Sequence, residues 1–538
     1  MKKILKTFLD NKLLFIFSIL ESFLQIYGSI LSSNGGLKDI GLLMIIFIII
    51  FTIIIFSINL VYFKLLSIKY KNNDKYVFSK KKFLILWLLI FVMWIPVLLS
   101  YYPTIWAYDV YNQVPHLIGD KLSTHHPIFH TLFIELFLII GKSIKNYEFG
   151  MLLLSLVQML VTSCIFAFVI EKIKSNINNK LFRNIFFICM IIFYGLLPFN
   201  SIMSISMTKD VLFSSLLLLL VIYIYDLIDG KPSNSIMFIF ISALLLLIKN
   251  NSIFIYLVML MFSIFILKRV EWVMFAKRCL ISIMVFYIIL DGLILIFKPS
   301  RGNKLERYPV ELQNLNYVLI NHPEVQKDKE LLFDILPKKS LKYDVEFYYD
   351  KRNADIVKTI YEKSVGNEFD SKVLIKNWIH YGIKYPVDYI DSWSNLTIGS
   401  WYLFDESHAN IYYGDNQGYL LTDYKIIDGI SNKRPDSKFK FGFDLLEKVA
   451  TENVQYKYQI IRFIFEPATY IISFFLMFIY LISKHKKREL LPLILFVALY
   501  INILFGPVII LRYIYPFIIF VPVLFTRIIY LNNIKRED

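Results

Sequence analysis

Cysteine is scarce in this chain: only three of its 538 residues are cysteines. Cys164, Cys189 and Cys279 lie in apolar stretches, and no two of them have CxxC spacing. The sequence therefore supports neither a disulfide framework nor a zinc site. It also lacks internal repeats and low-complexity linkers. No small-residue cleavage site follows the first apolar run, so we expect residues 12–31 to form an uncleaved membrane span.

Acidic residues are outnumbered by basic ones, 42 against 58, which gives a net charge of +16. In a soluble chain this excess would suggest a nucleic-acid partner. Here the cations cluster in short loops between apolar blocks, the pattern that orients a protein in a membrane. We therefore expect no nucleic acid, and we expect the lipid bilayer and its anionic headgroups as partners.

Long apolar blocks dominate the sequence, which is 57% hydrophobic with a mean hydropathy of +0.57. Blocks of about 17 to 25 residues are long enough to cross the hydrocarbon layer as helices. The sequence thus predicts an α-helical polytopic membrane protein with about twelve transmembrane helices. The predicted spans are 12–31, 40–63, 83–101, 148–171, 181–198, 210–228, 233–249, 252–267, 278–297, 459–482, 489–506 and 508–530.

The apolar stretch 127–141 is too short for a comfortable span, and leaving it out puts every dense basic loop on one side. Those loops carry Lys69, Lys71, Lys75, Lys80, Lys81, Lys82; Lys172, Lys174, Lys180, Arg183; Lys268, Arg269, Lys277, Arg278; and Lys484, Lys486, Lys487, Arg488. We expect this side, with both termini, to be cytoplasmic. Residues 127–141 then form a helix in, or dipping into, the outer interface.

This topology divides the chain into three parts and places it in the cell membrane. Residues 1–297 form an N-terminal transmembrane module with an external loop at 102–147. Residues 298–458, of mixed charge, form an extracytoplasmic domain whose fold the sequence does not reveal. Residues 459–538 supply the last transmembrane helices.

The external loop 102–147 contains the first candidate site residues. Asp109 follows the third span and Gln113 lies shortly after it, while His125 and His126 precede the interfacial helix. An aspartate beside Trp and Tyr can equally be a hydrated interfacial residue. Two adjacent histidines suit hydrogen bonding to a phosphate or a hydroxyl better than a metal, because adjacent side chains in a turn diverge.

Further ionisable residues fall on the same predicted side. Lys209 and Asp210 open the sixth span, where an aspartate can instead cap the helix. Lys249 lies in an outer turn and can alternatively extend to headgroups. Arg512, followed by Tyr513, sits inside an apolar span, where an arginine requires an anion, a water-filled cavity or a structural ion pair. Ionisable groups at membrane depth usually mark a functional site.

These residues resemble the GT-C superfamily of membrane glycosyltransferases. Asp109 matches the acidic residue in the first external loop of those enzymes. His126-Pro127 resembles the His-Pro element that opens an interfacial helix in the protein O-mannosyltransferase and aminoarabinose-transferase branches. Ile128 replaces their second proline, and Asp109-Val110 replaces the usual Asp-Glu pair.

The pattern is closer still to a poorly characterised bacterial multi-spanning family within that superfamily. The matching residues are Tyr108, Asp109, Gln113, His125, His126, Pro127, His130, Thr131, Lys209, Asp210, Arg512 and Tyr513, with further similarity from Tyr385-Pro386 to Trp401-Tyr402. The resemblance implies a GT-C-like bundle and a polyprenyl-phosphate sugar as donor.

We therefore expect an inverting glycosyltransferase with Asp109 as general base, its carboxylate made more basic by partial burial. Lys209, Lys249 or Arg512 would hold the departing phosphate, while Trp401 and Tyr402 would offer stacking faces to a sugar. Asp210 would orient a cation, or bind a divalent ion such as Mg²⁺ or Mn²⁺ together with Asp109. The acceptor is open: a protein, a wall polymer or a glycolipid.

Three other functions compete with this one. A lipid-linked glycan flippase also needs charges in its bundle, although transporters commonly place them near the midplane on repeated halves. A polysaccharide polymerase or ligase shares the lipid-linked substrate. A purely structural scaffold does not account for the polar residues around Asp109.

Overall fold

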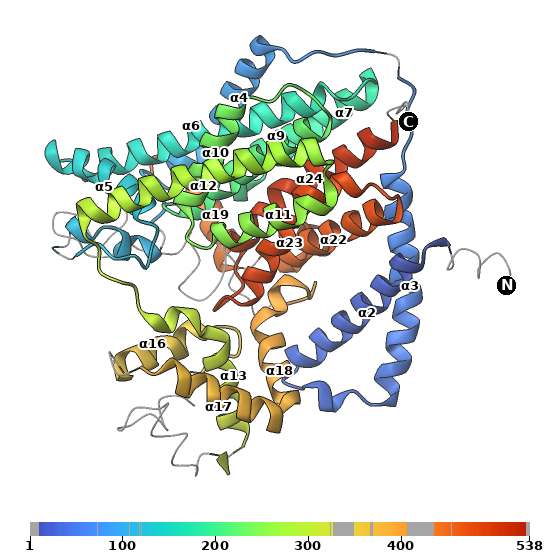
Figure 1. The fold of residues 1–538 in the computed structure, drawn as a ribbon, viewed down its shortest axis with the longest axis vertical. Coiled ribbons are helices and arrows are strands. Elements are labelled where there is room, and N and C mark those ends of the chain that lie inside the picture. Colours follow the sequence, from blue (N-terminus) through green and yellow to red (C-terminus); the bar gives the residue numbers. More distant parts are fainter. Residues whose placement is uncertain are drawn as a thin grey trace.

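The computed structural model describes residues 10–72, 74–106, 108–117, 119, 121–322, 324–325, 349–365, 369–405, 435–452 and 454–533. Within these ranges the regular structure is helical, with four isolated β-bridges and no strand (Figure 1). The helices before residue 298 are α2 (Lys12–Ser32), α3 (Leu42–Leu66), α4 (Lys80–Ser100), α5 (Ile128–Ser143), α6 (Tyr147–Lys174), α7 (Lys180–Ile191), α8 (Pro198–Ser204), α9 (Lys209–Ile228), α10 (Ser235–Ile248), α11 (Ser252–Ile266) and α12 (Arg269–Phe297).

The remaining helices follow in two groups. The first is α13 (Pro309–Asn321), α16 (Ala354–Val365), α17 (Ser371–Lys384) and α18 (Pro386–Thr397). The second is α19 (Lys440–Thr451), α20 (Val454–Lys457), α21 (Gln459–Phe465), α22 (Pro467–Ser483), α23 (Leu490–Leu504) and α24 (Leu511–Asn533). Helix α12 begins nine residues before the predicted span 278–297, so the expected basic loop 268–278 is mostly helical.

Seven described helices are long and apolar enough to cross a membrane, and nine if each bent pair counts as one span. One bend, of 49°, precedes Pro198 in the predicted span 181–198; the other, of 70°, precedes Pro467 in the predicted span 459–482. Each bend follows from the proline, which lacks an N–H and pushes the preceding residue into extended backbone. Helices α10 and α11 are apolar but shorter.

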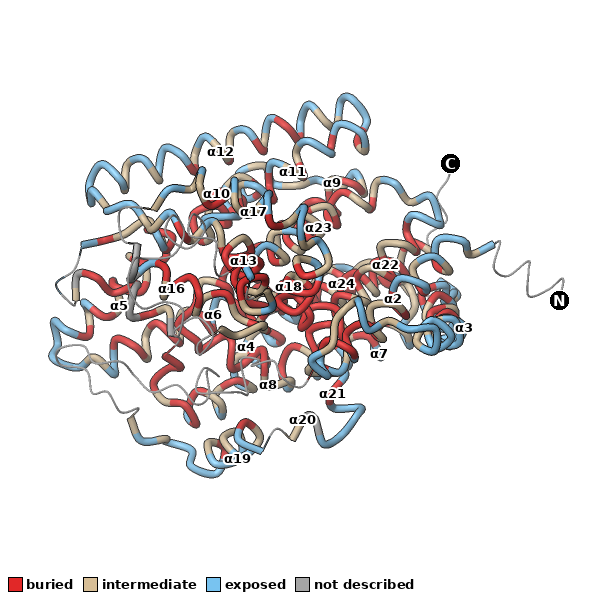
Figure 2. Tube along the Cα trace, turned by 90° about the horizontal axis from the view of Figure 1, so that it is seen from below, coloured by how far each residue is buried: buried red, intermediate tan, exposed pale blue. Residues whose placement is uncertain are grey.

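Helices α9 and α24 form the centre of the bundle and pack against each other. In each, 78% of the most apolar window is buried, compared with 11% in α12 (Figure 2). Helix α12 exposes large apolar side chains such as Leu295 and Ile296 on the outside of the bundle. Such an apolar outer surface suits contact with lipid rather than water.

The predicted interfacial helix is present as α5, which packs against α6. Gly141 and Gly150 permit the close approach, because a Cβ on either glycine would collide with the backbone of the other helix. Buried residues of α5 include His130, Thr131 and Glu135, so these three polar side chains face protein. The orientation of α5 relative to a membrane stays a prediction.

The described part of segment 298–458 is helical and has its own apolar core, built from residues such as Leu312, Leu315, Tyr361 and Tyr381. In Figure 1, α13, α16 and α17 lie together beneath the helices of the bundle. Helix α19 instead packs on α4, where the Lys438 amide donates to the Leu99 carbonyl at 2.9 Å. The described helices of this segment therefore pack in two different places: one group around its own apolar core, and α19 against α4 of the bundle.

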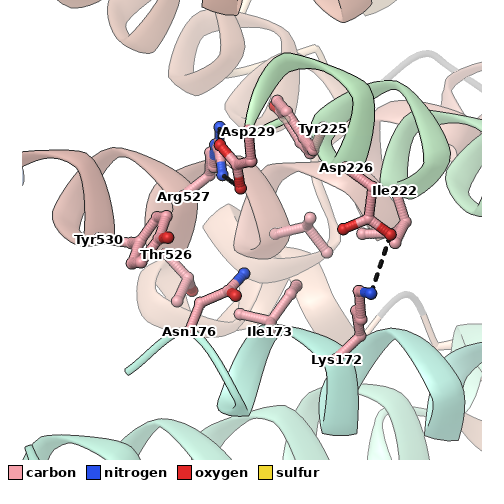
Figure 3. A pocket seen from close by; sticks show the side chains of 11 residues that line it. Lys172, Ile173, Asn176, Ile222, Tyr225, Asp226, Asp229, Thr526, Arg527 and Tyr530 are labelled. Carbon is pink, nitrogen blue, oxygen red and sulfur yellow. Dashed lines mark hydrogen bonds and ion pairs between the residues drawn. The ribbon is translucent and has the colours of Figure 1, made fainter. Parts of the chain in front are cut away.

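Ion pairs join the basic loops at one end of the bundle. Arg183 pairs with Asp74, and Arg488 lies 2.8 Å from Glu271. Arg527 of α24 contacts Asp229 at 2.6 Å and Glu489 at 2.9 Å, and Figure 3 shows the Arg527 side chain directly beside Asp229 at the edge of a small pocket. These contacts join the first basic cluster to the second and the third to the fourth, while their cytoplasmic location stays a prediction.

Candidate functional site

A short backbone pairing brings the external loop to the start of α9. The Ile105 amide donates to the Ile205 carbonyl at 3.0 Å, and the Met207 amide donates to the Ile105 carbonyl at 3.0 Å. Thr104 Oγ1 adds a hydrogen bond to the same Ile205 carbonyl. Asp109 lies only four residues after Ile105 in the chain, so this pairing holds it close to the beginning of α9.

Asp109 lies at the centre of the site, on a 3₁₀ turn spanning Tyr108–Gln113. Its Oδ2 accepts a hydrogen bond from Arg512 Nη1 at 2.7 Å and lies 3.8 Å from Lys209 Nζ. The Asp109 side chain is 20% exposed, whereas that of Arg512 is 4% exposed. Arg512 also bonds to the hydroxyl of Tyr513 at 3.1 Å. The predicted proximity of these residues is present in the structure.

A second carboxylate, Asp210, completes the charged cluster. Lys249 Nζ donates to Asp210 Oδ1 at 2.8 Å, and Arg512 Nε lies 3.8 Å from Asp210 Oδ2. Arg512 thus lies between two carboxylates. The Asp210 side chain does not cap α9, because Thr208 is the N-cap residue and accepts from the Asp210 amide at 3.4 Å. Lys249 points into the cluster instead of extending away from it.

We call Asp109, Lys209, Asp210, Lys249 and Arg512 the ionic cluster. It contains three cations and two carboxylates, so it carries one net positive charge. The aromatic rings of Phe213 and Tyr513 lie 4.7 Å and 5.5 Å from Lys249 Nζ. These faces stabilise the ammonium group by cation–π attraction.

The rings of the two adjacent histidines pack edge to face, with centroids 4.4 Å apart, so the expected divergence of their side chains is wrong, but each contacts a different partner. His126 is 6% exposed, and its Nδ1 lies 3.2 Å from Lys209 Nζ, which joins it to the ionic cluster. His125 Nδ1 lies 3.9 Å from Glu306 of the linker to α13. The Asn250 side chain donates to the carbonyls of Thr124 and His125 at 3.3 Å, which ties this turn to Lys249.

Gln113 contacts His130, not the charged residues. Gln113 Oε1 lies 2.7 Å from His130 Nδ1, and both side chains are fully buried. His130 was named in the sequence only as part of the family pattern. Because His126 lies two residues before the first residue of α5, the spacing of the two histidines in the sequence does not place them on one helix face.

Trp401 and Tyr402 are not brought together with the ionic cluster. They pack in a small apolar cluster with Tyr27 and Leu31 of α2, and the Trp401 ring stacks on Tyr27 at 6.2 Å. Their exposed fractions are 8% and 7%. The expectation that they offer open faces to a sugar is therefore wrong for this arrangement, because burial against α2 already covers the rings.

The environment of Asp109 opposes another expectation. Burial alone would raise its pKa, but the charges of Arg512, Lys209 and His126 outweigh burial and hold the pKa below its usual range. The predicted gain in basicity is thus wrong while Arg512 is in place. Burial and then the charge of Lys209 lower the pKa of His126 to about 2, so His126 is neutral. Burial lowers the pKa of His130 to about 3.

A divalent metal does not fit this cluster. Both carboxylates are already paired with cationic side chains, and no group of three or more His, Cys, Asp or Glu side chains in the described ranges could hold a metal ion. A metal bound by Asp109 and Asp210 would have to displace Arg512 and would face Lys209 and Lys249. Like-charge repulsion disfavours that exchange.

Two backbone contacts outside the cluster were not visible in the sequence. The Thr124 amide donates to the Ser300 carbonyl at 2.9 Å, beside the histidines. The Ala354 amide, at the start of α16, donates to the Pro507 carbonyl at 2.8 Å, five residues before Arg512. The segment after α12 therefore contacts both loops that carry the site.

Over the residues that the structure describes, the fold and site define a class: a helical protein with at least seven helices suited to a membrane and a buried ionic cluster at one end of its central helices. The chain belongs to the family described as "Family of unknown function (DUF6020)", whose model matches residues 119–537. The match includes His126, Lys209, Asp210, Lys249 and Arg512, and begins after Asp109 and Gln113. Neither a curated protein nor a solved structure matches the chain.

Proposed function

We propose that this protein is an inverting glycosyltransferase that moves a sugar from a polyprenyl-phosphate donor to an acceptor hydroxyl at the outer membrane face. The observation that carries the proposal is the position of Arg512 between Asp109 and Asp210, with two lysines beside them. Guanidinium and ammonium groups suit a phosphate, and a carboxylate suits the proton of a hydroxyl.

The net charge of the ionic cluster supports a donor with one phosphate. A polyprenyl-phosphate sugar is a phosphodiester and carries one negative charge. That charge balances the single positive charge that the two carboxylates leave uncompensated in the cluster. Buried charges are costly unless they are paired, so binding of a monoanion would complete the pairing.

Donor binding would also release Asp109. In the free protein Arg512 Nη1 bonds to Asp109 and keeps the carboxylate weakly basic. A phosphate competes for the same guanidinium group, which favours bidentate contact with phosphate. As Arg512 turns to the phosphate, Asp109 loses a stabilising charge and its pKa rises. The base would thus become active only when the donor is present.

The transfer is a single displacement. The acceptor oxygen forms a bond to the anomeric carbon from the face opposite the phosphate, and the bond from that carbon to the phosphate oxygen breaks. The phosphate keeps the electron pair, held by Arg512 and Lys209, and Asp109 takes the acceptor proton. One displacement inverts the anomeric centre. Lys249 holds Asp210, and Asp210 orients Arg512.

The direct test uses the purified protein in nanodiscs with a polyprenyl-phosphate sugar and a mixture of candidate acceptors. Release of free polyprenyl phosphate that depends on Asp109 supports transfer. In cells lacking the protein, unused sugar-bearing donor should accumulate. If the donor crosses the membrane in the presence of the protein without losing its sugar, and Asp109→Asn does not slow that movement, a lipid flippase explains the data instead.

A further inference from the structure

Within the part of the chain that the structure describes, four buried polar atoms beside the ionic cluster have no hydrogen-bond partner. They are Nε2 of Gln113, Nε2 of His126, Nε2 of His130 and Oγ1 of Thr131. The four residues are between 0% and 6% exposed. Unpartnered buried polar groups are rare in folded proteins, and several on neighbouring residues call for a ligand.

The four side chains come from one small region. Gln113 is bonded to His130, so its amide nitrogen also lies close to that ring. His126 lies two residues before the first residue of α5, and His130 lies in the first turn of that helix, with Thr131 next to it in the chain. His126 touches Lys209 of the ionic cluster. The unpartnered atoms are therefore neighbours of the proposed phosphate site.

The existing hydrogen bonds fix which atoms donate. Gln113 Oε1 can only accept, so His130 carries its hydrogen on Nδ1, and its Nε2 is an acceptor. The Lys209 ammonium can only donate, so His126 Nδ1 accepts, and its Nε2 carries the hydrogen. The amide nitrogen of Gln113 donates, and the Thr131 hydroxyl does both. A mixed set of neutral donors and acceptors matches hydroxyl groups, each of which donates and accepts.

We propose that Gln113, His126, His130 and Thr131 bind the hydroxyl groups of an uncharged sugar. This assignment rests on the proposed function and specifies its donor. The cations of the ionic cluster would hold the phosphate, and this neutral group would hold the sugar ring attached to it. A uronic acid or an amino sugar would bring a charge against side chains that offer no counter-charge, so both are excluded from the subsite.

The test compares two lipids on the same purified protein in nanodiscs: a polyprenyl phosphate bearing glucose, and the same polyprenyl phosphate without sugar. The variants are Gln113→Met, His130→Leu and Thr131→Val; Thr131→Val keeps the side-chain shape and is the least disruptive to folding. The control is His380→Gln, an exposed histidine on α17. Gel filtration and thermal unfolding identify variants that fail to fold.

We expect His130→Leu and Gln113→Met to weaken binding of the glucose-bearing lipid about tenfold, and Thr131→Val less, while binding of the sugarless lipid stays the same. Replacing glucose by glucuronate or glucosamine should weaken binding to the unmodified protein. If every variant binds the two lipids with equal affinity, the proposed sugar subsite is wrong. It is also wrong if the variants lose affinity for both lipids to the same extent. Failure to bind even the sugarless lipid overturns the proposed function itself.

Discussion

The guanidinium of Arg512 donates to the carboxylate of Asp109 at 2.7 Å, although 403 positions separate the two residues in the chain. Arg512 lies at the start of α24, and Asp109 lies in the 3₁₀ turn Tyr108–Gln113, which follows α4 in the chain. A contact between such distant segments depends on the whole bundle, and Arg512 is also within 3.8 Å of Asp210. The first predictions concern this contact.

Asp109→Asn should abolish transfer while leaving donor binding intact. The amide keeps the shape of the side chain but cannot take the acceptor proton, so we expect a loss of at least about 100-fold in turnover. Release of polyprenyl phosphate measures turnover, and lipid binding is measured separately. Asp444→Asn, on the exposed face of α19, is the matched control. Full activity in Asp109→Asn would remove the carboxylate from the mechanism.

Arg512→Met should destabilise the protein by about 3–5 kcal/mol, because it leaves two buried carboxylates without their shared cation. Arg512→Lys keeps the charge but cannot reach both carboxylates with a planar fork, so its effect should be smaller. Thermal unfolding in detergent measures both. Adding Asp109→Asn to Arg512→Met should recover part of the loss. Strictly additive effects would show that the two side chains are not coupled.

Stability should fall as the pH drops below about 6.5, the ordinary pKa of histidine. The pKa values of His126 and His130 are lowered by burial to about 2 and 3, so both stay neutral in the folded protein and gain protons on unfolding. Each histidine then contributes a slope of about 1.4 kcal/mol per pH unit between its two pKa values. The depressed pKa of Asp109 adds stability that is lost only below pH of about 4.

The measurement is the free energy of unfolding from pH 4.5 to 7.5. His126→Asn and His130→Asn should each flatten the slope, whereas His380→Asn should not change it. A profile that is flat in the unmodified protein would mean that the two histidines are solvated and titrate normally.

Chelating agents should leave transfer unchanged. Arg512 and Lys249 already neutralise the two carboxylates that would have to bind a divalent ion. The measurement is the rate of transfer in excess EDTA, and again after Mg²⁺ or Mn²⁺ is added back. Loss of activity with EDTA and recovery with either ion would show that the cations move aside for a metal.

Arg527→Met should also destabilise the protein by about 3–5 kcal/mol, although it lies at the other end of α24. Arg527 bonds to Asp229 at 2.8 Å and 2.6 Å and to Glu489 at 2.9 Å, so its removal takes the guanidinium away from two buried acids, with Lys231 still 3.1 Å from Asp229. Thermal unfolding measures the loss. The ion pair between Arg527 and Asp229 joins α24 to α9 at one end, and the ionic cluster joins the same helices at the other end. We therefore expect Arg527→Met to lower turnover as well. Lys440→Met, an exposed position, provides the control.

Local features of the sequence predicted much of the fold. Each of the twelve predicted spans coincides with a described helix or a bent helix pair, because a long apolar block is a property of neighbouring residues. Pro198 and Pro467 mark the two bends for an equally local reason. The start of α12 was wrong by nine residues, since charged residues can also occupy the end of a helix.

The candidate site was only partly predictable. Ionisable residues in apolar surroundings stand out in any sequence, so Asp109, Lys209, Asp210 and Arg512 could be chosen without coordinates. Trp401 and Tyr402 could not be excluded, because nothing in their neighbours reveals that α2 covers their rings. The depressed pKa of Asp109 was also hidden, because it depends on the distance to Arg512.

The sequence by itself determined that this chain forms apolar helices with a few costly charges among them. Helix formation and hydrophobicity are set by residues within a few positions of each other. Only the tertiary structure decided which charges meet. Coulombic pairing falls off over a few ångströms, so one guanidinium placed between two carboxylates, from segments hundreds of residues apart, requires the packed bundle to bring them together.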